Sequence, residues 1–552
     1  MLSTMRISRH CIFLFFYLFV KEDVSAQSFN EILGRPTDKS MTISVLFSDV
    51  VQVYFEYGTS QGVFSQSTAT ITSLPETPVV MELQPLLANT RYYYRTVFKT
   101  PGAANFQVGP TRTFHTQRAP GATFTFTVEA DEHLYDKKGI RSLYQICLDN
   151  QAKDEADFMF SLGDTFGDDH TPETTTSDDM KELHRDYRQY LGAVCHSMPF
   201  FFCLGNHEGE SGYFLEQTPP NNIAVYGTNW RKFYYPNPFP NDFYSGNTTL
   251  EQYGIGHPEN YYAFSWGDAL FVVLDVYRDC NVNEKPQKWD WTLGETQYKW
   301  LKTTLETSTQ QHKFVFAHHN RGQGRGGIIP ATGFEWGGMD ADQYKFDTYR
   351  PGWGLPIHQL MVAHGVNIFF QGHDHLYAKE ELDGLVYQEV PMPSDTSYEI
   401  GVLANANAYT DITLDGSGHL RVTVDPTCVT VDYVAAYLPK DTLGVHKNRE
   451  IRHQYKVGVC EVPTGGGPSL DGPFFEIFPN PATEKLNIRV KNTAAFDRRI
   501  ELVNMQGQLI QTTVLSAELD VCTINLGGVL SGIYLVKISN GNFVKTIKVA
   551  VF

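Results

Sequence analysis

The stretch NIFFQGHDHLYA, residues 367–378, places three bulky apolar residues ahead of a polar end that contains two histidines. The apolar run predicts a buried strand, and Gly372 after it allows the main chain to approach other groups closely. We expect His373 and His375 to be presented beyond the strand end, with Asp374 between them pointing away. A His-x-His pair is also common in solvated loops, so its meaning depends on whether similar residues end other strands.

Potential metal ligands also follow other apolar strands expected between residues 123 and 431. They are Asp131 and His133 after FTFTVEAD, Asp164 after FMFSLGD, Asn206, His207 and Glu208 around FFFCLGNHE, and His318 and His319 after FVFAHH. These strands alternate with helices expected at 138–150, 178–193 and 295–305, which indicates a layered α/β domain. Ligands in such domains bind beyond the carboxyl ends of the strands. The repeated endings therefore predict one metal centre rather than several unrelated polar loops.

The ligand types also indicate which metals the centre would hold. Aspartate, histidine and an asparagine carbonyl suit Zn, Fe or Mn, whereas Ca²⁺ prefers oxygen ligands alone. Two such ions about 3.5–4 Å apart can share a carboxylate and clamp both oxygens of a phosphoryl transfer. A water bound to such a metal loses its proton near pH 7, so a metal-bound hydroxide is the expected nucleophile.

The series D-x-H, GD, GNHE, H and GHxH, read from residue 131 to residue 375, resembles the calcineurin-like metallophosphoesterase family. The resemblance implies a β-sandwich flanked by helices, with a dinuclear centre at one end. It also implies the role of each residue. The first metal would be held by Asp131, His133, Asp164 and His375. Asp164 would bridge to the second metal, which Asn206, His318 and His373 would complete. His207, oriented by Glu208, would be the general acid or transition-state donor.

Residues near His318 are possible substrate contacts. Within HHNRGQGRGG, Arg321 and Arg325 could grip a phosphate bidentately, although solvated loop charges are an equal alternative. His318 is preferred over His319 as the ligand because the family often has proline two positions after this histidine, where Asn320 stands. His319 is then either a substrate contact or, the favoured interpretation, a histidine packed behind the site.

Residues 28–117 are expected to form a small β-sandwich, because short β-branched and aromatic runs alternate there with turn residues. The segment LQPLLANTRYYYRTVF resembles the fibronectin type III-like domain that precedes the catalytic domain of purple acid phosphatases. HDHLYAKE, with Tyr377, resembles the closing motif of those enzymes. Gly167 occupies the position of their metal-binding tyrosine, and His133 has no counterpart in them. The resemblance therefore implies a relative without the purple colour, whose catalytic domain spans residues 121–435.

Both ends of the chain indicate export. Residues 1–26 have a basic start, an apolar run too short to span a bilayer, and small residues before the expected cleavage point, which is typical of a signal peptide. A linker is expected at 436–474, around PTGGGPSLDGP. The all-β segment 475–552 resembles the C-terminal sorting domain of type IX secretion, through FPNPATEKLNI, MQGQLI and LSGIYLVKI. An adhesive or carbohydrate-binding sandwich is the alternative.

Composition excludes one class of partner. The 552-residue chain has a net charge of −18, and nucleic acid binding depends on Lys and Arg that neutralise phosphates. We therefore expect no nucleic acid partner. Of the eight cysteines, Cys11 lies in the signal peptide, and the rest form no CxxC pair. Pairing of Cys428 with Cys460, or of Cys195 with Cys203, is conceivable in an oxidising compartment.

These features predict a secreted or surface-attached phosphatase that is exported through the periplasm. It would hold two transition metals (Fe, Zn or Mn), act on phosphate monoesters of a small phosphorylated substrate, and meet the type IX secretion machinery through its tail. No transmembrane segment is expected. A phosphodiesterase or nucleotide hydrolase is the first alternative. A non-catalytic extracellular binding protein is the second, but such a protein would be expected to lack some of the ligands.

Overall fold

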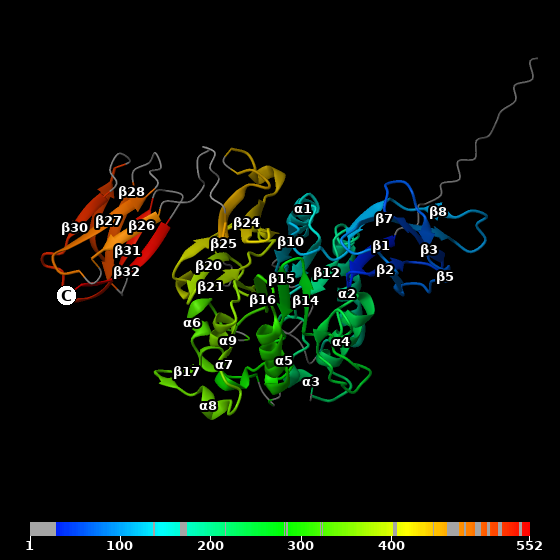
Figure 1. The fold of residues 1–552 in the computed structure, drawn as a ribbon, viewed down its shortest axis with the longest axis horizontal. Coiled ribbons are helices and arrows are strands. Elements are labelled where there is room, and N and C mark those ends of the chain that lie inside the picture. Colours follow the sequence, from blue (N-terminus) through cyan, green and yellow to red (C-terminus); the bar gives the residue numbers. More distant parts are fainter. Residues whose placement is uncertain are drawn as a thin grey trace, which may run out of the picture.

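The computed structural model describes residues 29–551 except 136–138, 166–173, 216, 281, 283–284, 321, 323, 401–405, 445, 461–473, 480–481, 492–497, 505–507, 517–520 and 540–543. The expected signal peptide, Gly167 and Arg321 lie outside the described residues. Figure 1 shows three units along the chain, coloured blue, cyan to yellow, and orange to red. The architecture matches the expected multidomain arrangement, with β-sandwiches at both ends.

The N-terminal unit is a sandwich of two sheets. One sheet has the order β1-β2-β6, and the other is built on β4-β3-β7-β8, with β5 paired to β3 and β9 to β7. Their bounds are β1 Phe29–Gly34, β2 Met41–Phe47, β3 Gln52–Gly58, β4 Gln66–Ser67, β5 Ile71–Thr72, β6 Val79–Leu83, β7 Arg91–Lys99, β8 Gln107–Val108 and β9 Arg112–His115. Alternate residues of β3 are buried, because successive side chains of a strand point to opposite faces.

Hydrogen bonds join this sandwich directly to the central unit. The side chain of Arg188, on α2, is fully buried, and it donates to Oδ1 of Asn30 and to the carbonyl of Ser44, each at 2.5 Å. The main-chain N–H of Leu33 donates to the carbonyl of Cys195 at 2.8 Å. A buried arginine with these partners fixes the first sandwich against the central unit.

The central unit packs two sheets face to face, in the orders β12-β11-β10-β23-β24-β25 and β13-β14-β15-β16-β19-β21-β20-β22. The first contains β10 Phe124–Glu129, β11 Phe158–Ser161, β12 Phe200–Phe202, β23 Ser417–Val424, β24 Cys428–Ala436 and β25 Ile451–Gly458. The second contains β13 Ser245–Gly246, β14 Tyr262–Trp266, β15 Ala269–Val273, β16 His312–Phe316, β19 Ile368–Gln371, β20 Tyr377–Leu382, β21 Leu385–Glu389 and β22 Ile412–Leu414. A short hairpin, β17 Met339–Asp340 with β18 Gln343–Tyr344, lies outside both sheets.

The core between these sheets is rich in phenylalanine. Phe126, Phe160, Phe316 and Phe370 are fully buried, and the rings of Phe160 and Phe316 stack across the two sheets with centroids 4.2 Å apart. β10, β11 and β12 run parallel, as do β15, β16 and β19. Their carboxyl ends therefore meet at one edge of the sandwich, where the expected ligands follow.

Helices cover the outer faces of the two sheets (Figure 1). The three expected helices are present as α1 Arg141–Ala152, α2 Ser177–Leu191 and α5 Gly294–Thr307. α2 begins with a capping box between Thr176 and Asp179, which satisfies main-chain N–H groups at the helix start. The shorter helices are α6 Ile328–Ala331, α7 Phe334–Gly337, α8 Phe346–Tyr349, α9 Ile357–Ala363 and the 3₁₀ turns η1 Lys288–Asp290, η2 Ala406–Ala408 and η3 Pro439–Asp441.

The span 208–261, expected to be a long loop, also contains helices. α3 covers Gly212–Leu215, and α4 covers Ile223–Tyr234. The sequence of α4, IAVYGTNWRKFY, contains one glycine and many β-branched and aromatic residues with low helix propensity, so its pattern did not indicate a helix. Tertiary contacts stabilise it, since the buried Arg231 donates to Oε1 of Glu210 at 2.6 Å.

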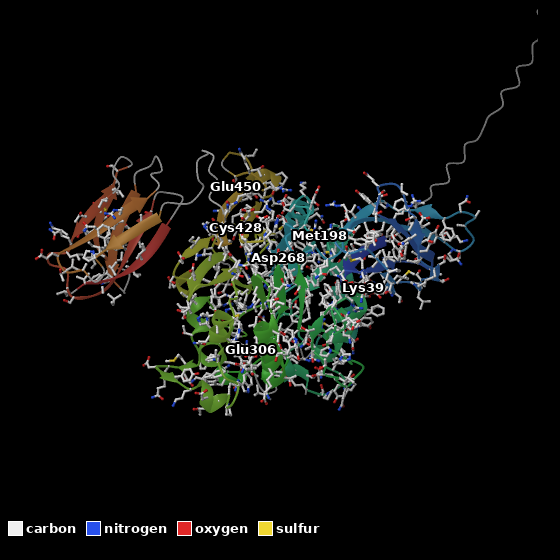
Figure 2. All side chains as sticks on the ribbon, in the orientation of Figure 1. Lys39, Met198, Asp268, Glu306, Cys428 and Glu450 are labelled. Atoms are coloured by element: carbon white, nitrogen blue, oxygen red, sulfur yellow. A yellow bond between two sulfur atoms is a disulfide. The ribbon has the colours of Figure 1, made fainter. Side chains whose placement is uncertain are left out.

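The expected linker at 436–474 starts too early. β25 pairs with β24 as the edge strand of the central sheet, and a disulfide joins Cys428 (labelled in Figure 2) to Cys460 just beyond it. The central unit therefore continues to residue 460, and the remaining part of the expected linker lies largely outside the described residues. The other conceivable pair does not form, because Cys195 and Cys203 are both free and buried.

The C-terminal unit is a second sandwich, with sheets β26-β27-β30 and β29-β28-β31-β32. Its strands are β26 Phe474–Phe478, β27 Lys485–Lys491, β28 Arg498–Asn504, β29 Leu509–Leu515, β30 Val521–Asn525, β31 Gly532–Ser539 and β32 Val544–Val551. Its core includes Leu486, Ile500 and Val536. Across the described residues of the whole chain, no helix has the length and apolar character needed to cross a membrane.

Candidate metal centre

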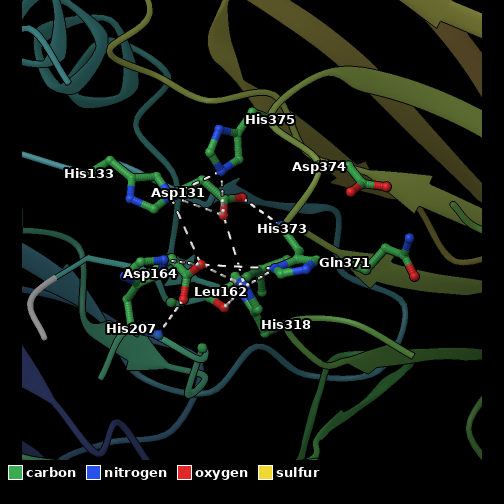
Figure 3. A network of polar contacts seen from close by, with 12 residues as sticks. Asp131, His133, Leu162, Asp164, His207, His318, Gln371, His373, Asp374 and His375 are labelled. Atoms are coloured by element: carbon green, nitrogen blue, oxygen red, sulfur yellow. Dashed lines mark hydrogen bonds and ion pairs between the residues drawn. The ribbon is translucent and has the colours of Figure 1, made fainter. Parts of the chain in front are cut away.

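The residues that follow five parallel strands meet in one buried cluster (Figure 3). Asp131 and His133 follow β10, Asp164 follows β11, Asn206 and His207 follow β12, His318 follows β16, and His373 and His375 follow β19. All of them are buried except His207, whose side chain is 12% exposed. The fold therefore brings together six of the seven predicted metal ligands, which are Asp131, His133, Asp164, His318, His373 and His375.

Three groups of side chains in this cluster have ligand atoms within 4.8 Å of one another. They are Asp131, His133 and His375; His133, Asp164 and His207; and Asp164, His318 and His373. Asp164 belongs to two of the groups, and its Oδ2 lies 3.0 Å from Nε2 of His318 and 3.9 Å from Nε2 of His133. A carboxylate in this position can be shared between two ions.

Each aspartate directs one carboxylate oxygen into the cluster and has the other held by the main chain. Oδ2 of Asp131 accepts the N–H of His373 at 2.8 Å, and Oδ1 of Asp164 accepts the N–H of His207 at 2.8 Å. The remaining oxygens, Oδ1 of Asp131 and Oδ2 of Asp164, lie among the histidine nitrogens. These hydrogen bonds fix the orientation of both carboxylates.

Most of these residues have an unusual backbone conformation. The φ angles of Asp131, His133, Asp164, His373 and His375 are 62°, 45°, 60°, 79° and 61°. Positive φ is costly for residues with a Cβ, and such strain concentrates at functional sites. Each turn redirects the chain immediately after its strand, so that the side chain points into the cluster rather than along the sheet.

Two glycines allow the loops to approach the aspartates closely. A Cβ on Gly372 would lie 2.6 Å from Oδ2 of Asp131, and one on Gly205 would collide with Oδ1 of Asp164. The close approach expected at Gly372 is therefore present, and the group it approaches is the Asp131 carboxylate. Any larger residue at either position would displace a carboxylate of the cluster.

The cluster holds strong electrostatic interactions. Burial opposes ionisation of Asp164, but the charges of His318, His207 and His133 keep its pKa well below the usual value. Burial likewise disfavours protonated His318, yet Asp164 and Asp131 raise the pKa of that imidazole to about 9. Burial raises the pKa of Asp131 and lowers that of His373. A cation placed between the two carboxylates would balance their negative charge, as the protonated His318 imidazole does without it.

Several atoms of the cluster fit metal ligation. Oδ1 of Asp131, Oδ1 of Asn206 and Nε2 of His373 are buried without a hydrogen-bond partner among the described residues. Buried polar atoms are normally satisfied, so these orphaned atoms indicate a missing partner. Nδ1 of His318 lies 2.8 Å from the carbonyl of Leu162, the kind of contact that orients a ligating histidine. The residues present therefore fit a pair of transition-metal ions.

His207 lies at the edge of the cluster. Its Nε2 is 3.9 Å from Oδ2 of Asp164, and its ring meets the ring of His133 edge to face, with centroids 4.8 Å apart. Its partial exposure contrasts with the fully buried His318. A histidine in this position can reach a substrate that approaches from solvent.

Glu208 holds three main-chain N–H groups of the loops around the cluster. Its carboxylate accepts the main-chain N–H groups of Asp164 at 3.0 Å, Thr165 at 2.8 Å and Gly205 at 2.6 Å. Its expected role in orienting the His207 ring stays a prediction. Burial and the charge of Asp164 raise its pKa to about 7. Glu208 therefore fixes the loops that carry Asp164 and Asn206.

Of the residues expected to contact the substrate, Arg325 is partly exposed and His319 is fully buried. The side chain of Arg325 is 37% exposed, and its Nη1 donates to the carbonyl of His373 at 2.7 Å. Nε2 of the fully buried His319 lies 3.1 Å from the carbonyl of Gly326, and burial lowers its pKa to about 4. This favours the interpretation of His319 as a histidine packed behind the site. As expected, Asp374 points away from the cluster (Figure 3).

Two buried groups behind the centre were not predicted. Glu132, between Asp131 and His133, accepts hydrogen bonds from the hydroxyl groups of Thr165 and Ser161. Tyr409 donates its hydroxyl to Asp374. The sequence did contain a signal for Glu132, which stands between two predicted ligands in the run EADEH. A charged residue at a buried strand end is rarely without partners, so hydrogen bonds to Glu132 could have been expected. Nothing in the local sequence indicated Tyr409, which comes from a distant loop.

Comparisons with known proteins agree with this geometry. The calcineurin-like phosphoesterase family model matches residues 124–377, and the secretion system C-terminal sorting domain model matches residues 476–551. The structure of PhoD is similar at 16% identity and a TM-score of 0.55, over 77% of this chain and 89% of that one. The purple acid phosphatase PPD1 from yellow lupin seeds is similar at 13% identity and a TM-score of 0.52, over 81% of this chain and 78% of that one. No curated protein matches the sequence.

Proposed function

We propose that this chain, a metal-dependent phosphoesterase with a calcineurin-like phosphoesterase domain and a C-terminal sorting domain, hydrolyses phosphate monoesters after export. The sorting domain indicates export by type IX secretion, to the cell surface or beyond it. We further propose that residues 1–26 are a signal peptide and that the first sandwich is a fibronectin type III-like domain.

One observation carries the proposal. Asp164 stands between two groups of buried ligands, and both groups contain polar atoms that lack a partner among the described residues. We assign Asp131, His133, Asp164 and His375 to one ion, and Asp164, Asn206, His318 and His373 to the other. Fe, Zn or Mn would suit these ligands. When bound, two such ions supply a water that ionises near neutral pH and positive charge for the phosphate oxygens.

The protein's own residues would orient and complete the reaction. The main-chain N–H groups of His373 and His207 hold the two carboxylates, and Glu208 holds the loop that carries Asp164. His207, at the exposed edge of the cluster, would donate a hydrogen bond or a proton to the leaving oxygen. Such assistance is typically worth about 10²–10⁴-fold in rate.

The test is a substrate panel on metal-loaded protein. p-Nitrophenyl phosphate, bis-p-nitrophenyl phosphate and a set of nucleotides would be compared with Fe, Zn or Mn added. The proposal expects the monoester to have the highest kcat/KM. A higher value for the bis-ester would make the protein a phosphodiesterase instead. No hydrolysis of any ester at full metal occupancy would overturn the proposal.

A further inference from the structure

Asp374, between the two histidines of the closing motif, is the centre of a buried polar network that faces away from the metal cluster. Its side chain is completely buried. Oδ1 accepts Nη1 of Arg325 at 2.8 Å, and Oδ2 accepts the main-chain N–H of Gly326 at 2.7 Å together with the hydroxyl of Tyr409. A buried carboxylate with three donors, one of them charged, is a strong anchor.

This network fixes the loop of Arg325 beside the metal cluster. Gly326 has a φ of 92°, and a Cβ there would lie 2.6 Å from the carbonyl of Ala408, so the two loops are in close contact. Nη1 of Arg325 also donates to the carbonyl of His373 at 2.7 Å, and Nδ1 of the same His373 is 4.0 Å from Oδ2 of Asp164. The guanidinium therefore contacts the main chain of a proposed metal ligand.

Arg325 keeps donors for another partner. Only its Nη1 is engaged, and neither Nε nor Nη2 has a hydrogen-bond partner in the part of the chain that the structure describes. The side chain is 37% exposed. A guanidinium that is anchored at one nitrogen and open at the others is suited to bind an anionic oxygen, because less side-chain freedom is lost on binding.

We propose that Asp374 is a positioning residue that holds Arg325 to bind a phosphate oxygen, and that this pair selects monoesters over diesters. This inference rests on the proposed function. A monoester has three non-bridging oxygens and a diester has two. If the two ions each take one oxygen, only a monoester retains a further charged oxygen for Arg325, whereas a diester presents its second ester group there.

The test is the ratio of kcat/KM for p-nitrophenyl phosphate to that for bis-p-nitrophenyl phosphate, measured on the full-length, metal-loaded protein. Arg325→Gln should lower the monoester value by roughly 10- to 100-fold, the effect of one charge-assisted hydrogen bond, and should leave the diester value nearly unchanged. Asp374→Asn should lower the ratio in the same direction, because an amide is neutral and has one acceptor oxygen, which cannot serve both Arg325 on one side and the Gly326 N–H and Tyr409 hydroxyl on the other. Inorganic phosphate should inhibit both variants more weakly than it inhibits the wild type.

A double variant separates positioning from folding. If Asp374 acts through Arg325, adding Asp374→Asn to Arg325→Gln should cause no further fall in the ratio. Asp383→Asn, at an exposed aspartate in the turn between β20 and β21, is the control and should leave the ratio unchanged. Metal content is measured for every variant.

The outcomes distinguish this inference from the proposed function. An unchanged ratio in Arg325→Gln, in a protein that hydrolyses the monoester, would overturn the inference alone. Equal losses for both esters, or metal loss in Asp374→Asn with independent effects in the double variant, would show that Asp374 only supports the metal ligands. A wild type that is inactive with both metals bound would overturn the proposed function itself.

Discussion

Asp164 and His207 contact each other twice, and the two contacts have different consequences. The main-chain N–H of His207 donates to Oδ1 of Asp164 at 2.8 Å, while Nε2 of the His207 ring lies 3.9 Å from Oδ2 of the same carboxylate. The first contact belongs to the backbone and survives substitution of the side chain. The second places a partly exposed imidazole beside the carboxylate proposed to bridge two ions. The backbone and the side chain of His207 can therefore be tested separately.

Asp164→Asn should remove both metals. The wild type should hold close to two transition metals per chain, since its ligands are too many for one tetrahedral site. Asp164 is the only residue assigned to both ions, so its loss weakens both, whereas Asp131→Asn should weaken mainly one. Elemental analysis after dialysis measures this. Retention of one full equivalent in Asp164→Asn would contradict the bridging assignment.

His207→Ala should slow the reaction by about 10²–10⁴-fold while both metals stay bound. The defect should shrink for p-nitrophenyl phosphate relative to an alkyl phosphate, because p-nitrophenolate needs little protonation. Asn206→Ala, one residue earlier, should instead lower occupancy of the second metal and be partly rescued by excess metal. Equal metal loss in the two variants would mean that His207 is a ligand or a structural residue.

The backbone strain predicts an unusual order of stability in the metal-free protein. At His375, where φ is 61°, substitution by Gly should give a protein about 1 kcal/mol more stable than substitution by Ala, because only Gly adopts this conformation freely. His318 is the control, since it is absent from the positive-φ residues, and there Ala should be the more stable variant. Denaturant unfolding of the four variants measures the difference. The same order at both positions would refute the strain argument.

His453 should make the protein less stable in mild acid. Burial and the charge of Lys379 lower the pKa of this histidine to about 4, against about 6.5 in an unfolded chain. The unfolded state therefore binds the proton more readily, and stability present above pH 6.5 is lost as the pH falls toward 4. His453→Gln should reduce the loss between pH 7 and pH 5 by at most about 2 kcal/mol. His446→Gln, at an exposed position, is the matched control for these unfolding curves.

Deletion of residues 464–552 should leave a folded and active enzyme that is retained inside the cell. The central sheet and its disulfide end by Cys460, and all the proposed ligands lie upstream. Activity and metal content of the purified truncated protein, and its distribution between cells and medium, provide the measurement. Normal export of the truncated chain would contradict the sorting role of the tail.

The sequence predicted much of this molecule because its signals are local. Apolar strands such as residues 368–371 are followed at once by Gly and by ligand residues, and the carboxyl ends of parallel strands meet at one edge. The cluster of Asp131, Asp164 and His373 could therefore be predicted without coordinates. The three sandwich-containing units and the main helices followed from periodicity for the same reason.

The features that the sequence did not predict depend on contacts between segments far apart in the chain. α4 forms despite low helix propensity because Arg231 meets Glu210, and β25 belongs to the central sheet because it pairs with β24. Glu208 accepts the main-chain N–H of Asp164, which lies 44 residues earlier in the chain. Asp374 could be expected to point away from the metals, but its partners come from loops far apart in the chain. Residue order sets which side chains end the strands, and only tertiary packing decides which distant atoms those side chains meet.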